Sequence, residues 1–541
     1  MAPIGPCRPL PPEPLPAPPL NDPQRPLPAV ADRSPAPRLA ALLGRGEGWL
    51  LHPGRSALLA VALGALLLPV VRERWPMAAL ALLAFWLLLQ TLRLEAPLLE
   101  KVPFPPLTVL VLGMVMRWGL GPLLMALAGG GGDPFLGVWV DHGTSSQLLW
   151  LAITAAVVLL AQLQRRAIAQ AAAALPPAPL VGAFQADPLL RRRLGWVALL
   201  LGTYMLVYLV LSVLSGAFDR QFDTYLRWVH TLWRLDTPVA AFSRLRDLWL
   251  VLVPLLLCCL RGVGRWLTAA LLLLFLAVAL LSGSRGLLFY PLLLLLAGLW
   301  LVPVPPRLLR RLVLLAASLM LVLSPLIFVV RDSAAFQASR GLDPVGRLAA
   351  VGAVLQHPEP LLAKTRWVGR DLYACHDPYL FTPAHRADAA VGAAGLPNLL
   401  WLWVPRHLRP DRPEIFDGPR IAKQLQGVPR GTWADVWFPC FSLPADLWRR
   451  WGLAGIALGS LLVAVLVNGL CSLWYRSLFL GGRTFGLLLL LYPASYLQAF
   501  PFGTVQETSW ALFWELPKYL LTLAVLGALV DRLAGRAGPA A

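Results

Sequence analysis

The stretch from Trp266 to Val302, WLTAALLLLFLAVALLSGSRGLLFYPLLLLLAGLWLV, decides the fold. It consists of two strongly apolar runs joined by five small or polar residues, SGSRG at 282–286, with one full charge at Arg285. Each run is about as long as a helix needs to be to cross a bilayer when its ends snorkel. The pattern predicts a hairpin of two membrane-spanning helices with a short, charged tip.

The composition of the rest of the chain agrees with this interpretation. Of 541 residues, 58% are hydrophobic and only 14% are charged, which is more apolar surface than a soluble core can use. The net charge of +19 would indicate nucleic-acid binding in a soluble protein. In a membrane protein the positive-inside rule explains it, so we expect no nucleic-acid partner.

Apolar runs of suitable length recur along the chain and predict an all-α polytopic membrane protein with about 12 transmembrane helices. The predicted spans are Ser56–Val71, Met77–Leu92, Thr108–Ala128, Gln147–Leu163, Leu194–Ala217, Leu248–Leu260, Trp266–Leu281, Leu287–Val302, Leu312–Val330, Gly452–Leu473, Phe485–Leu497 and Lys518–Val530.

The distribution of Lys and Arg predicts cytoplasmic N and C termini. With that orientation, 22 of the 47 Lys and Arg fall on inner segments and about nine in or beside the short outer loops. The Pro-rich residues 1–50 are expected to be a disordered cytoplasmic tail. The predicted division is 51–330 for helices 1–9, 331–450 for a long outer loop, and 451–541 for helices 10–12 with a short tail.

The polar residues that could bind a substrate or take part in catalysis are concentrated on the predicted outer face. Arg285 lies there, where the charge rule disfavours it, and so does the long loop. Arginine suits bidentate phosphate binding, and on helices Arg340 and Arg347, or Arg366 and Arg370, would share a face. The alternative is that these arginines pair with Asp332, Asp343 and Asp371 or contact lipid headgroups.

Several outer residues are candidates for a general base, namely Asp332, His357, Glu359, Asp371, His376, Asp435 and Asp446. The cysteines show no metal-ligand spacing. Cys375 and Cys440, the two in the long loop, are either a disulfide or two separate thiols.

The hairpin tip, the long outer loop before the tenth span and the re-entry ADLWRRWGLAGIALGSLLVAVLVNG (445–469) together resemble the bacterial O-antigen polymerases, the Wzy-type oligosaccharide repeat-unit polymerases. In that family an acidic residue and an aromatic precede FGxxG and a helix rich in small residues. Asp446, Trp448, Gly452 and Gly455 occupy those places, with Trp451 where Phe is usual. The resemblance covers roughly residues 190 to 500.

The resemblance implies a metal-independent membrane glycosyltransferase without a cofactor in the bacterial inner membrane. It would transfer glycan from undecaprenyl pyrophosphate to an acceptor sugar hydroxyl on the periplasmic face, with membrane lipid around it and a chain-length regulator as a further partner. The implied pyrophosphate ligands are Arg285, Arg331, Arg340, Arg347, Arg366 and Arg370, and the tip residues Ser282, Gly283, Ser284 and Gly286 form the turn. The catalytic base would be one of Asp332, His357, Asp371 and Asp446.

Two other functions fit the same span count. An O-antigen ligase would use the same donor with lipid A core or protein as acceptor, and nothing in the sequence excludes it. A polysaccharide flippase or other transporter would be expected to show an internal repeat and charges within several spans, whereas we find no repeat and only Arg117 well inside a span. A metal-dependent enzyme of the polyprenyl-sugar type is disfavoured by the short first outer loop, VRERWP.

Overall fold

The protein is described here from a computed structural model. It describes residues 62, 75–99, 105–128, 134–174, 187–214, 244–282, 285–302, 304–334, 336, 343–357, 377–382, 392–404, 409, 411, 413, 421, 441–477, 488 and 503–536, apart from some side chains within these helices. All of them belong to one compact unit, 34–541.

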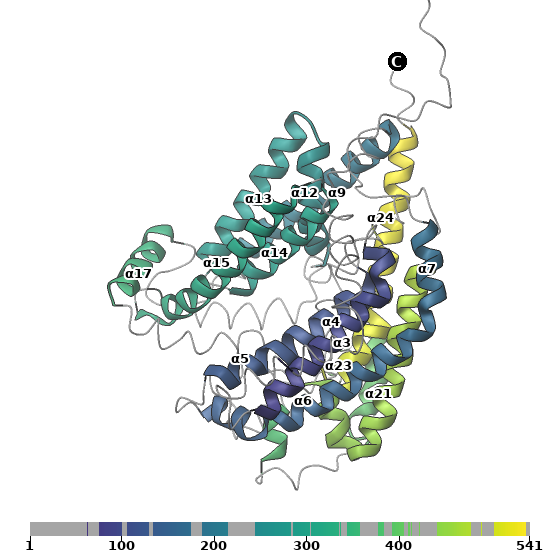
Figure 1. Cartoon of the computed structure of the whole chain (residues 1–541). Coiled ribbons are helices and arrows are strands. Elements are labelled where there is room, and N and C mark those ends of the chain that lie inside the picture. The colour runs from purple at the N-terminus through teal and green to yellow at the C-terminus, as the bar shows by residue number, and fades with distance from the viewer. Residues whose placement is uncertain are drawn as a thin grey trace, which may run out of the picture. The chain divides into compact units, whose positions relative to one another are not determined.

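Every regular element in these residues is a helix (Figure 1). The α-helices are α3 (Trp75–Leu99), α4 (Pro106–Val115), α5 (Gly121–Ala128), α6 (Pro134–Ala161), α7 (Arg165–Ala174), α9 (Pro188–Leu214), α12 (Arg244–Cys259), α13 (Val263–Leu281), α14 (Arg285–Gly298), α15 (Pro306–Asp332), α17 (Pro344–Gln356), α21 (Leu443–Ser477), α23 (Val505–Trp510) and α24 (Leu516–Arg536). Shorter turns are the π-helical η1 (Met116–Leu120) and η9 (Ala511–Glu515) and the 3-10 segments η2 (Gln162–Gln164), η3 (Leu299–Leu301), η4 (Asp377–Phe381) and η6 (Leu396–Trp403).

Seven stretches of helix are long and apolar enough to cross a membrane. They are Trp75–Leu99, Pro106–Leu124, Asp141–Ala173, Pro188–Leu214, Val263–Leu281, Leu443–Arg476 and Val505–Gly535. The chain is therefore an all-α, multi-span membrane protein, as the composition predicted. Three more predicted spans coincide with α12, α14 and α15, which are not among these seven, and two, 56–71 and 485–497, lie outside the described residues apart from 62 and 488. The total of about twelve stays a prediction.

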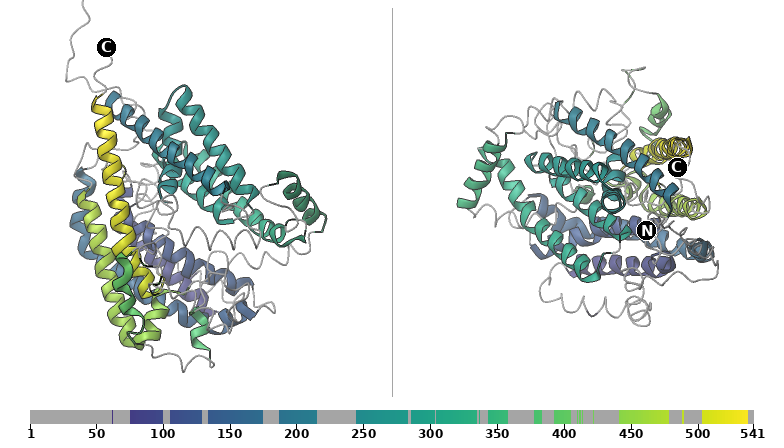
Figure 2. Two further views of the ribbon diagram at one scale, coloured as in Figure 1. Left: turned by 180° about the vertical axis from the view of Figure 1, so that it is seen from behind. Right: turned by 90° about the horizontal axis from the view of Figure 1, so that it is seen from above.

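The described helices pack in two groups of neighbours, which can be followed in Figure 2. In the first group α6 contacts α21 and α3, and α3 also contacts α4 and α7. In the second group α12 contacts α9, α13 and α14, and α15 contacts α14 and α17. Helix α24 packs along α9 of the second group, whereas α23, at the start of the same candidate span, contacts α21 of the first group.

Several helix ends differ from the predicted ones. Helix α3 continues to Leu99 rather than ending at Leu92, and α6 begins at Pro134, so most of the connection between the predicted spans Thr108–Ala128 and Gln147–Leu163 is helical. Proline is well accepted in the first turn of a helix, and beyond Pro134 only isolated glycines interrupt the stretch. The predicted loop 331–450 contains α17, η4 and η6, and α21 already begins at Leu443.

Helix α21 breaks at Gly452, the residue at which the tenth span was predicted to begin. Its backbone angles, φ 59° and ψ −140°, belong to a region that only glycine adopts readily. The turn brings Leu447 back onto the following helix. A Cβ atom on Gly455 would lie 2.3 Å from the Leu447 carbonyl oxygen, so this position also needs glycine. The backbone geometry therefore explains why both Gly452 and Gly455 of the re-entry are glycines.

Candidate functional site

The hairpin tip that carries Arg285 is short and begins with a buried serine. Ser282 is fully buried after α13, and its hydroxyl donates to the Ala279 carbonyl oxygen at 2.7 Å. Arg285 is the first residue of α14 and Gly286 the second, although their side-chain surroundings, like residues 283 and 284, are outside the described set. The predicted helical hairpin is thus confirmed as two helices separated by three residues.

Packing between α14 and α15 places the tip at a defined end of the helix pair. Leu288, three residues into α14, forms a small apolar cluster with Ile327, five residues before the end of α15. The N-terminus of α14 and the C-terminus of α15 therefore lie at the same end of the pair. Arg331, which is half-buried, and Asp332, whose side chain is not described, are the last two residues of α15.

Helix α17 packs onto this end of α15 through a second apolar cluster. Val330 and Phe336 meet Ala350 and Val354 of α17. Arg347 of α17 is 4% exposed, and its guanidinium carbon lies 3.4 Å from the centroid of the Phe336 ring. A guanidinium stacked on an aromatic face keeps its charge while it loses rotational freedom. Arg285, Arg331 and Arg347 thus belong to three elements that meet at one corner, which we call the α14–α15–α17 corner.

The remaining predicted residues of the long loop are only partly described. Helix α17 starts at Pro344, and the Asp343 carboxylate before it accepts from the backbone N–H groups of Val345 and Gly346. Arg340 lies outside the described residues, so the helix face expected to be shared by Arg340 and Arg347 stays a prediction. His357 follows the last turn of α17 and is exposed. The candidates outside the described set are Arg340, Glu359, Arg366, Arg370, Asp371, Cys375, His376, Asp435 and Cys440.

Asp446 lies at the centre of a second polar cluster. It is fully buried, and its Oδ1 accepts from Arg449 Nη2 at 2.8 Å and Nε at 3.2 Å. Its Oδ2 accepts from Arg450 Nε and from the backbone N–H of Val505, both at 2.9 Å. Four donors fill the directions in which a carboxylate accepts hydrogen bonds.

The arginines around Asp446 hold other segments of the chain. Arg450 Nη1 donates to the carbonyl oxygens of Gly392, at 3.0 Å, and Ala394, at 2.7 Å. From α23, Gln506 donates to the Gly395 carbonyl oxygen at 2.9 Å. Asp446 therefore links the start of α21, the turn 392–395 and the start of α23.

Asp377, which the sequence analysis did not select, belongs to a neighbouring buried cluster. The carboxylate of this fully buried residue accepts from the backbone N–H of Ser442 at 2.8 Å and from the hydroxyls of Ser442 and Ser146. Ser442 in turn caps α21, because its hydroxyl accepts from the Ala445 N–H at 3.3 Å. The cluster fastens η4 to α6 and α21, and the Asp-Pro pair at 377–378 gave no signal of this.

Two other buried carboxylates connect helices. Asp247, fully buried in α12, binds Arg244 and Arg246, and Arg246 also donates to the Tyr208 hydroxyl of α9 at 2.9 Å. In α3, Glu95 accepts from the backbone of Leu107 and Thr108 at the start of α4, and from the Tyr475 hydroxyl of α21. Glu95 lies beyond the predicted span Met77–Leu92, so the apolar pattern gave no signal of its role.

Comparison with known proteins yields no match to a protein-family model, a curated sequence or a solved structure.

Proposed function

We propose that the protein polymerises lipid-linked oligosaccharide repeat units on the outer face of a bacterial inner membrane. The observation that carries the proposal is the α14–α15–α17 corner, where Arg285, Arg331 and Arg347 come from three packed elements. Several arginines beside apolar helix ends suit a ligand with a pyrophosphate head and a long lipid tail. The proposal also uses the resemblance of the hairpin tip and the re-entry to the O-antigen polymerases.

In the proposed reaction, a hydroxyl oxygen of the acceptor sugar attacks the anomeric carbon of the donor glycan. The bond from that carbon to the pyrophosphate oxygen breaks, and undecaprenyl pyrophosphate leaves. Negative charge grows on the leaving group in the transition state, so arginines held in place before the reaction stabilise it more than they stabilise the bound donor. The hydroxyl proton passes to an outer base.

Deletion of the gene, followed by a gel of the surface glycans, tests this proposal. We expect single repeat units in place of a ladder. Free lipid-linked polymer would instead indicate a ligase, and loss of all outer-face glycan would indicate a flippase. A ladder of normal length after deletion would refute all three functions, polymerase, ligase and flippase.

The role of Arg285 is tested by Arg285→Ala in the intact chain. We expect loss of long-chain polysaccharide with normal membrane insertion, because the leaving-group charge loses one partner. The matched control is Arg166→Ala, which removes an exposed arginine of α7, on a segment predicted to be cytoplasmic. Equal chain-length distributions in the two variants would exclude Arg285 from the site.

A further inference from the structure

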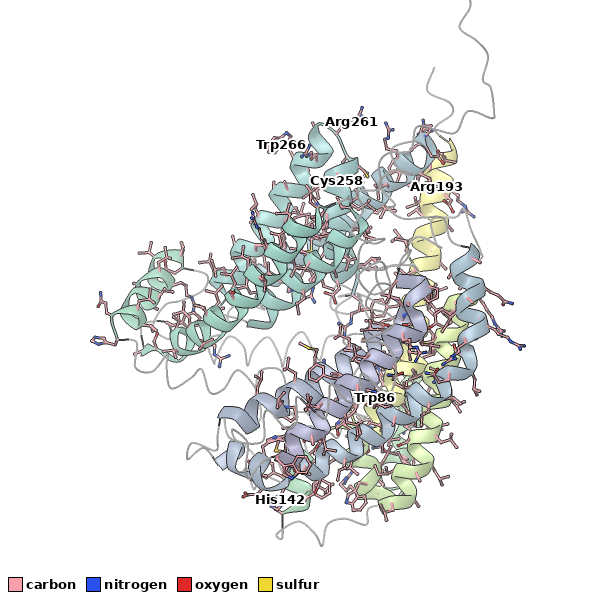
Figure 3. All side chains as sticks on the ribbon, in the orientation of Figure 1. Trp86, His142, Arg193, Cys258, Arg261 and Trp266 are labelled. Carbon is pink, nitrogen blue, oxygen red and sulfur yellow. The ribbon has the colours of Figure 1, made fainter. Side chains whose placement is uncertain are left out.

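A cavity opens at the turn between α12 and α13, away from the residues of the proposed function. Its volume is about 550 Å³, and its lining includes Arg261, Arg265 and Trp266 together with the apolar Leu257, Leu260 and Ala269. Figure 3 shows Arg261 and Trp266 at the tip of this helix pair, with Cys258 close to the tip on α12. The charge distribution of the sequence assigns this turn to the cytoplasmic side.

The two guanidinium groups of the cavity are available to a ligand. Both arginines are exposed, and neither makes an ion pair or a hydrogen bond with the residues that the structure describes. The lining contains no acidic residue. The first turn of α13 adds positive potential, because Gly262, its N-cap residue, has no side chain to accept from the free N–H groups. The polar part of the cavity is therefore complementary to an anion.

The rest of the lining is suited to the apolar part of a lipid. Leu257, Leu260 and Ala269 supply the apolar wall of the cavity. Trp266 is 76% exposed, and tryptophan is the side chain most typical of the level at which headgroups meet acyl chains. A free phosphate ion would use the arginines alone and leave the apolar wall and Trp266 without contact.

We propose that the α12–α13 turn is a binding site for an anionic phospholipid, with the lipid phosphate between Arg261 and Arg265 and the upper acyl chain against Leu257 and Leu260. Binding there would hold the turn at the membrane surface. The site does not depend on the polymerase assignment, because it uses none of the residues of the α14–α15–α17 corner.

The test uses the purified full chain in dodecyl maltoside micelles, titrated with dioleoyl phosphatidylglycerol and, separately, with dioleoyl phosphatidylcholine. Bound lipid is counted by native mass spectrometry, and the thermal midpoint is followed by circular dichroism. We expect selective retention of phosphatidylglycerol, with an apparent affinity that falls about fivefold when one arginine is replaced by Ala and roughly 30-fold in Arg261→Ala/Arg265→Ala. The charge-preserving pair Arg261→Lys/Arg265→Lys should retain most of the binding.

The control is Arg165→Ala/Arg166→Ala, which removes two exposed adjacent arginines of α7. If this variant loses as much phosphatidylglycerol as the double variant of the turn, the attraction is general and the proposed site is wrong. Unchanged lipid retention in Arg261→Ala/Arg265→Ala also refutes it. Inorganic phosphate that displaces the lipid and raises the midpoint on its own would identify a free-anion site instead.

Discussion

Replacement of Asp446 by Asn should unfold the N-terminal end of α21 at a lower temperature, although the two side chains have the same shape. The substitution removes the negative charge that Arg449 and Arg450 both bind. It also turns an amide NH₂ toward groups that are themselves donors, among them the Val505 N–H. Two guanidiniums, 8% and 3% exposed, would then lose their carboxylate partner while they stay buried.

The expected loss follows from that burial. Removal of one partner from a buried ion pair typically costs about 3–5 kcal/mol, because the other charge stays behind in a poorly solvated position. The pair of Arg409 and Asp411 provides a contrast in the same protein, since its side chains are 61% and 76% exposed and 3.8 Å apart. Asp411→Asn should cost less than about 1 kcal/mol.

Thermal unfolding of the two variants in detergent micelles, followed by circular dichroism, measures this difference. Limited proteolysis adds a local measurement, because the turn 392–395 loses its anchor when Arg450 is no longer held by Asp446. We expect a midpoint lower by several degrees and faster cleavage near that turn for Asp446→Asn alone. Equal midpoints for Asp446→Asn and Asp411→Asn would refute the structural role of Asp446.

Three further substitutions test the buried contacts between helices by the same thermal assay. Glu95→Gln should cost about 2 kcal/mol, since the amide NH₂ would replace one of the two oxygens that accept from the backbone N–H groups at the start of α4; a neutral result would show that the amide oxygen suffices. Gly455→Ala should destabilise by about 1–3 kcal/mol through its clash with the Leu447 carbonyl, whereas Gly469→Ala in the same helix, with open space at its Cβ, should not; equal effects would disprove the close approach. Asp377→Ala should cost about 3 kcal/mol by leaving Ser442 unsatisfied and should free η4 for proteolysis; an unchanged cleavage pattern would count against that anchor.

The sequence predicted those features of the fold that depend on local pattern. The apolar runs located helices, and Gly452, where the tenth span was predicted to begin, is the residue at which α21 kinks, because the backbone angles there favour glycine. The bonds of Asp446 to Arg449 and Arg450 follow from helical spacing of three and four residues. Its bond to Val505 could not be predicted, since the two residues are 59 positions apart in the chain.

Helix ends were the weaker part of the prediction, for a physical reason. Hydropathy stops a span at the first charge, so Glu95 was assigned to a connection, whereas the backbone of α3 continues to Leu99 and buries that carboxylate under the start of α4. A polar residue inside a helix is accepted wherever a neighbouring element satisfies it. Which element does so depends on tertiary packing, and the same holds for Asp377 and Asp247.

The buried carboxylates also bear on the choice of the base. A general base needs an open lone pair within reach of the acceptor hydroxyl. Asp446 has four donors on its two oxygens and no exposed surface, so a substrate proton would have to displace an arginine or the Val505 N–H before it could be accepted. His357 is exposed and directly follows α17, the helix that carries Arg347 at the α14–α15–α17 corner. Of the two proposed bases whose side chains the structure describes, His357 is therefore the one able to take a proton without first breaking an ion pair, and Asp446 is assigned to hold the N-terminal end of α21 in place.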